Sequence, residues 1–322
     1  MNKIVCLNPD YSTTRCLIYS SSIINGETAS SKYKGMQLLP DNTERTGEGG
    51  LRTQGYFKIE DCLDGEAKCL EKTTRKPLVT IITVVFNGAD TLEKTILSVI
   101  SQSYTNIEYI IIDGGSTDGT IDIIRKHEHA IDYWVSEPDT GIYDAWNKGV
   151  RLSNGEWIAF LGADDSYLEE AINAYIDSIL SNENSSVLEY VSSRVNLING
   201  TRTLRVIGAP WNWKVFRKYM NVAHIGSFHH RAIFDKYGLY DTTYKICGDY
   251  ELLLRAKSAL RAGYLEKITA NMEIGGKSNN NVLTFSEASR AKIKSGGRNR
   301  VVSQIEKIMA ILKWKARTYL WQ

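Results

Sequence analysis

The sequence has few of the features that mark secreted, membrane-spanning or zinc-binding proteins. Its 322 residues include five cysteines, and no two of them form a CxxC pair. An odd, scattered set of this kind favours reduced thiols over a disulfide framework or a structural zinc site. No apolar run reaches the ~18 residues that a membrane-spanning helix requires, and the N-terminus lacks the long apolar segment of a secretion signal. We therefore expect a cytoplasmic protein.

Glycine motifs that bind phosphate groups are also missing. Neither GxGxxG nor GxxxxGK[ST] occurs, so neither a Rossmann dinucleotide site nor a P-loop is supported. The turn "DGGSTDGT" at 113–120 resembles a phosphate loop only superficially. RNP, zinc-finger and helix-turn-helix patterns are absent as well, and we expect no nucleic-acid partner.

The net charge of +2 is unevenly distributed along the chain. Nine lysines and arginines but one acid, Glu306, fall between Arg290 and Gln322, so this segment carries +8 and the rest of the chain −6. The overall composition, with 43% hydrophobic and 24% charged residues, is ordinary for a globular protein. A basic tail on a mildly acidic body favours an anionic partner such as a membrane surface.

The pattern of the chain changes after residue 76. Residues 1–76 contain short β-like segments among polar and glycine-rich stretches, which predicts an irregular extension. Beyond it, near-continuous apolar, β-branched segments alternate with helical patterns, which is typical of a mostly parallel, mixed sheet flanked by helices. We expect an α/β domain over 77–285, with a donor half at 77–166 and an acceptor half at 167–285. A basic amphipathic helical tail follows at 286–322.

Polar residues follow several of the predicted strands. Asn87, Asp113 and the pair Asp164–Asp165 all lie where an apolar strand ends. In open α/β sheets, ligands bind outside the carboxyl ends of the strands. Taken alone, either aspartate of the pair could simply cap the next helix. Carboxylates from three strand ends instead favour a site for hydroxyl groups and a hard divalent cation.

The motifs in this region carry a family resemblance. "VTIITVVFNGADTLEKTILSVISQ", "IIIDGGSTDGT", "SEPDTGIYDAWNKGV" and "GEWIAFLGADD" occur in this order. From about Pro77 to about Gly276 the chain resembles a family 2, GT-A-fold, nucleotide-sugar glycosyltransferase. It is most similar to the bacterial branch that builds O-antigen and exopolysaccharide repeat units.

The resemblance implies roles for residues of the donor half. Val84 and Phe86 would line the base pocket, and Asp113 would hydrogen-bond the base. Asp164 would contact the ribose, and Asp165 would hold Mn²⁺ or Mg²⁺ on the diphosphate. The other implied donor-site residues are Thr83, Asn87, Gly114, Asp144, Asn147 and Ala163. At Ala163 the family often has an acid, and many relatives have arginine where this chain has Trp146.

Inverting transfer also needs a base that takes the proton of the acceptor hydroxyl. Asp249, in "YKICGDYELLLRA", matches the family's base, although locally it could equally be a first-turn helix acid. Glu251 is the second candidate. His224, which precedes an "SF" pair, would contact the acceptor or the diphosphate. Lys277, in "EIGGKSNNN", could meet phosphate in a closing loop.

The tail pattern places Val301, Ile305, Ile308, Leu312 and Tyr319 on one helical stripe with lysines and arginines interspersed. A basic amphipathic helix with tryptophans suits the membrane–water interface. The alternative is that the stripe packs on the domain or on a second subunit in a homodimer. We therefore expect a location on the inner face of the bacterial plasma membrane.

Together these patterns predict an inverting, metal-dependent transfer of a hexose from a nucleotide-diphosphate sugar. The expected donor is a UDP-hexose, and the expected acceptor is an undecaprenyl-diphosphate-linked sugar in O-antigen or surface polysaccharide synthesis. One alternative is a sugar-nucleotide nucleotidyltransferase, which would need an arginine-containing phosphate loop where the chain has "FNGADTLEK". The other is a non-catalytic nucleotide-sugar-binding assembly protein, which would tolerate loss of Asp249.

Overall fold

The computed structural model describes residues 4–20, 38–58, 61–62, 76–182, 188–275 and 282–320. Within them a ten-stranded mixed sheet has the order β11-β15-β12-β14-β10-β7-β8-β9-β3, with β13 paired to β12. Its strands are β3 (Gly47–Gly49), β7 (Val79–Val85), β8 (Ile107–Asp113), β9 (Tyr133–Ser136), β10 (Trp157–Gly162), β11 (Ser166–Tyr167), β12 (Tyr190–Asn199), β13 (Arg202–Ile207), β14 (Ser227–His230) and β15 (Ala262–Glu273).

Parallel pairing is concentrated in the middle of this sheet. Strands β10, β7, β8 and β9 run parallel to one another, and β12 runs parallel to β15. Strand β14 lies antiparallel between β10 and β12, and β3, β11 and β13 also pair antiparallel. The predicted mixed α/β sheet is confirmed, with its longest parallel part running from β10 to β9.

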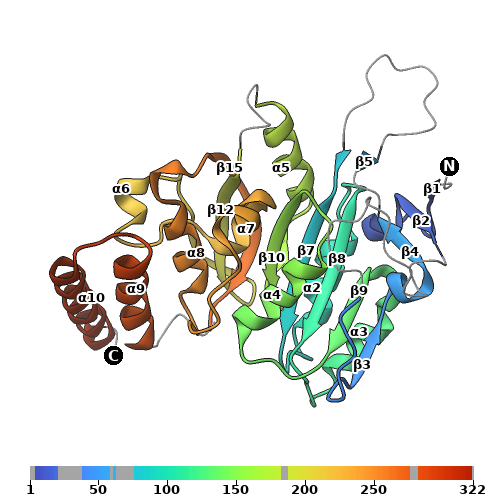
Figure 1. The fold of residues 1–322 in the computed structure, drawn as a ribbon, viewed down its shortest axis with the longest axis horizontal. Helices are drawn as coiled ribbons and strands as arrows, with labels where there is room; N and C mark the ends of the chain where they lie inside the picture. The colour runs from blue at the N-terminus through green and yellow to red at the C-terminus, as the bar shows by residue number, and fades with distance from the viewer. Residues whose placement is uncertain are drawn as a thin grey trace.

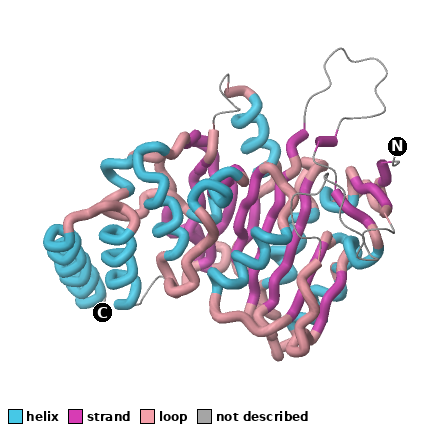
Figure 2. Tube along the Cα trace, in the orientation of Figure 1, coloured by secondary structure: helices cyan, strands magenta, loops and turns pink. Residues whose placement is uncertain are grey.

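Helices cover both faces of the sheet (Figure 2). The helices are α2 (Leu92–Ile100), α3 (Thr120–Lys126), α4 (Ile142–Leu152), α5 (Ala171–Leu180), α6 (Trp213–Phe216), α7 (Ala232–Tyr237), α8 (Gly248–Ala256), α9 (Val282–Lys294) and α10 (Arg300–Leu320). Alternate residues of a strand point to opposite faces, so Ile81 packs with α2, α3 and α5, whereas Ile82 packs with α4, α7 and α8. Both sides of β7 are therefore buried.

The N-terminal extension is joined to this sheet. Strand β3 pairs antiparallel with β9 and becomes the edge strand. Arg52 is almost fully buried and donates to a carboxylate oxygen of Glu108 at 2.6 Å and to the Leu152 carbonyl at 3.0 Å. Leu38 and Leu39 pack against the apolar cluster that includes Val84. The extension therefore supports the donor-side edge, in addition to forming a small sheet of its own.

That small sheet consists of β1 (Ile4–Val5), β2 (Leu17–Tyr19) and β4 (Tyr56–Lys58), and β5 (Asp61–Cys62) pairs with β6 (Lys76–Pro77). Cys6 and Cys247 are free thiols, as expected for reduced cysteines. Cys16 is disulfide-bonded, so the expectation of reduced thiols fails at this position.

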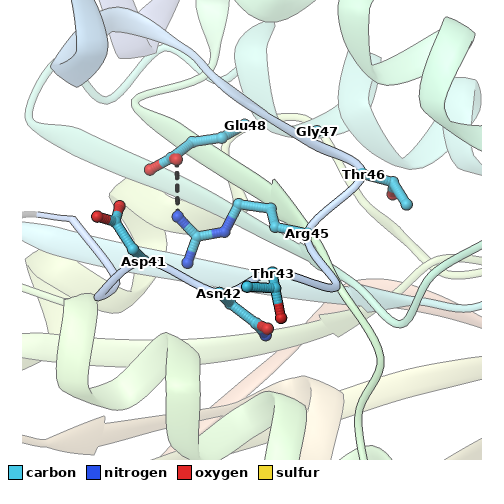
Figure 3. Close-up of a pocket in the computed structure, with 7 residues that line it drawn as sticks. All are labelled: Asp41, Asn42, Thr43, Arg45, Thr46, Gly47 and Glu48. Atoms are coloured by element: carbon cyan, nitrogen blue, oxygen red, sulfur yellow. Dashed lines mark hydrogen bonds and ion pairs between the residues drawn. The ribbon is translucent and has the colours of Figure 1, made fainter.

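A cavity of about 480 Å³ lies in the segment that leads into β3 (Figure 3). Its lining comes from one short stretch of chain: Asp41, Asn42, Thr43, Arg45, Thr46, Gly47 and Glu48. Arg45 extends across it and donates to Glu48 at 2.7 Å and to the Pro40 carbonyl at 2.6 Å. Its guanidinium group also reaches Glu137, in the loop after β9, at 3.1 Å.

Helices α9 and α10 lie at the end of the molecule opposite the N-terminal strands (Figure 1). They are held together by Ser289 and Ser303, whose hydroxyls are 2.9 Å apart, and by an ion pair between Lys292 and Glu306 at 3.1 Å. Helix α9 begins at Val282, a few residues before the tail was expected to start. No helix of the described residues is long and apolar enough to cross a bilayer.

Candidate active site

The parallel strands bring the predicted donor-side residues to one edge of the sheet. Val84 on β7 pairs in register with Ile112 on β8 and with Gly162 on β10. The residues that follow these three strands therefore lie next to one another at the carboxyl edge. They include Phe86 and Asn87 after β7, Asp113 and Gly114 at the end of β8, and Ala163, Asp164 and Asp165 after β10.

Asn87 joins the first two loops. Its backbone adopts a left-handed conformation with φ of 53°, and its N–H donates to the Ser116 hydroxyl at 2.7 Å. Its side-chain oxygen accepts from the Thr117 N–H at 3.0 Å. These two hydrogen bonds hold the loops together, so Asn87 supports the edge of the sheet.

Asp113 is fully enclosed by its own loop. One carboxylate oxygen accepts from the N–H groups of Gly115 and Ser116 at 3.1 and 2.9 Å and from the Ser136 hydroxyl at 2.6 Å. The other oxygen accepts from the Ser116 hydroxyl, and the residue has no exposed surface. The carboxylate that the resemblance assigned to the nucleobase therefore holds the conformation of the loop that follows β8.

Thr83 is also fully buried, and its hydroxyl accepts from Tyr109 at 3.2 Å. Thr83 can affect the binding of a nucleotide-sugar donor only indirectly, through the residues around it. Phe86 is the opposite case, because its ring is 62% exposed. Val84 is half-buried and packs against the same apolar cluster as Leu38 and Leu39 of the extension.

Asp164 and Asp165 bend back over Gly162. A Cβ atom at Gly162 would lie 2.9 Å from an oxygen of Asp164 and 2.6 Å from an oxygen of Asp165. The absence of a side chain at Gly162 therefore lets the two carboxylates approach the same point. Asp164 is exposed and Asp165 buried, and the second Asp165 oxygen accepts from the Glu273 N–H on β15 at 3.1 Å. Burial and the charge of Asp164 raise the pKa of Asp165 to about 7.

This pair fits a hard divalent cation. The oxygens that converge over Gly162 are the ligand type that Mg²⁺ and Mn²⁺ prefer. A cation would also relieve the repulsion that raises the pKa of Asp165. Within the described residues no group of three or more histidine, cysteine or acidic side chains is arranged to hold a metal. The other ligands would therefore have to be diphosphate oxygens and water.

Asp249 lies in the first turn of α8, in a second polar cluster. One of its oxygens accepts from the Tyr250 N–H at 2.8 Å and from the Tyr143 hydroxyl at 3.3 Å. Tyr143 belongs to α4, and its single hydroxyl proton is shared between Asp249 and the Ile246 carbonyl, which lies closer at 2.6 Å. Burial raises the pKa of Asp249 to about 6. A carboxylate with this pKa is suited to accept a proton near neutral pH.

Glu251, the second candidate for the general base, forms an ion pair with Arg255. Both of its oxygens are bound by the Arg255 guanidinium, and Ser295 donates to one of them. The residue is 1% exposed. It therefore has no oxygen available to take a proton from a substrate.

Glu287 on α9 is a residue that the sequence patterns did not single out. Its two carboxylate oxygens accept three consecutive backbone N–H groups, of Lys245 at 2.8 Å, Ile246 at 2.8 Å and Cys247 at 3.0 Å. These groups immediately precede α8, so the carboxylate fixes the approach to Asp249. Neither the separation of about 40 residues nor the local pattern around Glu287 signals this contact.

His224 lies in an aromatic cluster. Its ring stacks on Trp146 with centroids 4.5 Å apart, and its Nε2 is 3.2 Å from the Tyr240 hydroxyl. Burial and the neighbouring His229 lower the pKa of His224, and burial lowers that of His229 to about 4. Both rings are therefore neutral at pH 7. Trp146 contributes packing here, in place of the arginine of many relatives.

The remaining predicted residues occupy supporting positions. Asn147 is buried, and its side-chain amide both donates to and accepts from the backbone of Tyr240 at 2.9 Å. Asp144 accepts from the Thr140 N–H at 3.1 Å. Ala163 is half-buried beside Gly88. Lys277 lies outside the described residues.

Comparisons with known proteins identify the family of this chain. Residues 80–237 match the model of the glycosyl transferase family 2. A PGL/p-HBAD biosynthesis glycosyltransferase of Mycobacterium bovis is 32% identical over 210 residues, which cover 63% of this chain and 80% of the relative.

Solved structures share the fold. Staphylococcus aureus TarS 1–349 in complex with UDP-GlcNAc superposes with a TM-score of 0.55 at 12% identity, covering 71% of this chain and 70% of that one. The mannosyltransferase PcManGT of Pyrobaculum calidifontis, in complex with GDP-Man and Mn²⁺, has a TM-score of 0.50 at 17% identity and covers 76% of each chain. The sheet is thus that of GT-A glycosyltransferases, and the chain belongs to glycosyltransferase family 2.

Proposed function

We propose that this glycosyltransferase moves a hexose, with inversion, from a UDP-sugar to a lipid-linked diphosphate sugar acceptor in bacterial surface polysaccharide synthesis. The observation that carries the proposal is the convergence of Asp164 and Asp165 over Gly162. Two carboxylates held at the carboxyl edge of a parallel sheet suit a nucleoside diphosphate that binds with a divalent cation. The exposed ring of Phe86 lies at the same edge and offers a flat surface for a base.

The proposed mechanism assigns one task to each cluster. Asp165, assisted by Asp164, would hold the cation, which would supply Lewis-acid stabilisation of the leaving diphosphate. Asp249 takes the proton of the acceptor hydroxyl as that oxygen attacks the anomeric carbon from the face opposite the diphosphate. Tyr143 and the Tyr250 N–H orient the Asp249 carboxylate. His224 stays neutral and shapes the wall of the acceptor side through its stacking on Trp146.

The burial of Asp249 argues against a protein that only binds nucleotide sugars. Keeping a carboxylate in a site that disfavours its charge destabilises the fold. Such a cost is typical of catalytic groups and has no purpose in a binding module. The nucleotidyltransferase alternative finds no support either, because the loop after β7 contains no arginine.

The first prediction concerns the donor and the metal. We expect UDP release from one UDP-sugar of a panel only when Mn²⁺ or Mg²⁺ and a synthetic lipid-diphosphate-GlcNAc or -GalNAc acceptor are present. EDTA should stop the reaction, because without the cation the carboxylates of Asp164 and Asp165 repel the leaving diphosphate. Pyrophosphate release from a nucleoside triphosphate and a sugar phosphate would identify a nucleotidyltransferase instead. UDP release that is unchanged by EDTA would show that the reaction needs no divalent cation.

The tail has a surface suited to a membrane. Val301, Ile305, Ile308 and Leu312 form a stripe along α10 and are between 52% and 66% exposed. The opposite face packs on α9, so the stripe does not serve the domain core. Exposed Lys313 and Lys315 flank it. The side chain of Tyr319 lies outside the described residues. An apolar stripe bordered by lysines supports docking to anionic lipid on the cytoplasmic face.

The second prediction tests this docking. The double variant Ile305→Ser/Ile308→Ser should bind vesicles that contain anionic lipid at least about tenfold more weakly, because it removes two side chains that would enter the interface. Co-sedimentation with vesicles measures the effect. Leu204→Ser, which changes a residue of β13 that is 45% exposed, is the matched control and should bind like the parent. If the double variant instead splits a dimer and binds vesicles normally, the stripe is a subunit interface.

A further inference from the structure

The enclosure of Asp113 raises the question of which group recognises the nucleobase. All four hydrogen bonds to its carboxylate come from Gly115, Ser116 and Ser136, and the residue has no exposed surface. It cannot offer an oxygen to a ligand without dismantling its own loop. A different acceptor must therefore lie next to Phe86 if the proposed donor binds at this edge.

Asp139 is in the right place. A Cβ atom at Gly114 would lie 2.6 Å from Oδ2 of Asp139 and 3.4 Å from the ring of Phe86. The carboxylate of Asp139 thus occupies the space that a side chain at Gly114 would fill, beside an aromatic ring that is 62% exposed. Asp139 itself is only partly buried. An aromatic face and a carboxylate oxygen are therefore adjacent at the mouth of the site.

The loop that carries Asp139 is held from several sides. The Glu137 N–H donates to the Asp113 carbonyl at 3.1 Å. The Glu137 side chain is bound by Arg45 of the N-terminal extension at 3.1 Å and by Lys148 of α4 at 2.8 Å. Oδ1 of Asp139 accepts from the Gly141 N–H at 2.7 Å. These contacts fix the orientation of the carboxylate before any ligand binds, which lowers the cost of binding.

The Asp139 oxygen nearest Phe86 is Oδ2, and within the described part of the chain it carries no hydrogen bond. Oδ1 accepts from the Gly141 N–H. Guanine presents two neighbouring donors, N1–H and the 2-amino group, and is bound best by both oxygens of a carboxylate. Cytosine and adenine place an acceptor nitrogen next to their amino group, which a carboxylate repels. Uracil presents a single N3–H donor and matches one free oxygen.

We propose that Asp139, with the ring of Phe86, is the residue that reads the nucleobase of the donor, and that it selects uracil through its N3–H. The Asp139 loop is placed by Arg45, so the N-terminal extension takes part in this selection. The inference rests on the proposed function, because it presumes that a nucleoside diphosphate binds at this edge.

The experiment is calorimetric titration of the full chain with UDP, CDP, GDP and ADP in the presence of Mn²⁺. The variant Asp139→Asn keeps an oxygen for the Gly141 N–H and turns an amide donor toward the base. It should weaken UDP binding about 10- to 100-fold, since a hydrogen bond to a charged group is lost. CDP binding should improve relative to UDP, because the ring N3 of cytosine accepts from the new amide. Asp122→Asn is the matched control, since Asp122 is an exposed aspartate on α3.

Each outcome distinguishes the inference from the function on which it rests. A fall in UDP affinity with a raised CDP-to-UDP ratio supports Asp139 as the base reader. An equal loss for both nucleotides, or no loss, overturns it and leaves the UDP-sugar proposal standing. A parent protein that prefers GDP or ADP overturns the uracil assignment together with the UDP part of the proposed donor, and leaves transfer from a nucleotide-diphosphate sugar standing. A parent protein that binds none of these nucleotides overturns the proposed function and the inference together.

Discussion

Replacing Asp249 with asparagine should abolish sugar transfer and at the same time stabilise the protein. The amide cannot take a proton, so the rate should fall by about 10²- to 10⁴-fold. The asparagine side chain would keep an oxygen for Tyr143 and the Tyr250 N–H, so the local hydrogen bonds survive. The buried charge disappears, and with it a destabilisation on the order of 3 kcal/mol that follows from a pKa raised from 3.8 to about 6.

The pH dependence of both effects can be stated with its sign. Because the folded protein binds the Asp249 proton more tightly than the unfolded chain, the parent loses stability as the pH rises from about 4 to about 6. The stability gained by Asp249→Asn should therefore be full above about pH 6 and vanish near pH 4. Activity of the parent should fall about tenfold per pH unit below pH 6, since the base must be unprotonated. Urea unfolding and the pH profile of kcat measure these quantities.

Glu251→Gln provides the comparison. It removes a second buried carboxylate of α8, but one bound by Arg255 and Ser295, so it should destabilise the protein and leave the acid limb of the kcat profile in place. If Asp249→Asn retains transfer, Asp249 is not the base. If that variant is inactive but less stable than the parent, the burial argument for Asp249 is wrong.

The variant Gly162→Ala should lose metal-dependent donor binding while keeping its fold. Gly162 does not have a left-handed backbone, so alanine is not strained by φ. The new methyl group would collide with the Asp164 and Asp165 oxygens. These oxygens are terminal side-chain atoms, so the two carboxylates can rotate away without a change in the backbone. Displacement by about 1 Å in a catalytic site costs roughly 10²-fold in rate. We expect a loss of at least this size in kcat/KM.

The measurement is Mn²⁺ binding in the presence of UDP, with thermal unfolding as the test of the fold. Gly263→Ala on β15 is the control, because its Cβ would make ordinary contacts at 3.4 Å with Leu188 and Val191. It should bind Mn²⁺ and UDP like the parent. Normal Mn²⁺ affinity in Gly162→Ala would mean that the cation does not sit between the two carboxylates.

The sequence predicted the edge of the site better than the roles of the residues on it. Strand ends are visible as apolar runs that stop at polar residues, and this placed Asn87, Asp113 and Asp164 together. The orientation of Asp113 was also partly readable. An aspartate that is followed three residues later by Ser116 commonly binds that residue's backbone N–H in a local turn, which would have indicated a structural carboxylate.

Other roles depend on contacts that no local pattern reveals. Asn147 is used by the backbone of Tyr240, which is 93 positions away. Asp139 acquires its place because Gly114 has no side chain, and Glu287 because α9 folds back onto the start of α8. The pairing of β3 with β9 was equally hidden, since a three-residue edge strand leaves almost no trace in composition.

The hydrogen bonds between Glu287 and the turn before α8 bear on how the C-terminal helices can be gained or lost in evolution. A membrane anchor is usually a module that a protein can gain, lose or exchange, because its removal leaves the catalytic domain intact. Here helix α9, which carries α10, supplies the acceptor for three backbone N–H groups next to Asp249. Losing α9 would leave these groups without their partner. The C-terminal helices and the catalytic domain are therefore expected to evolve as a single unit.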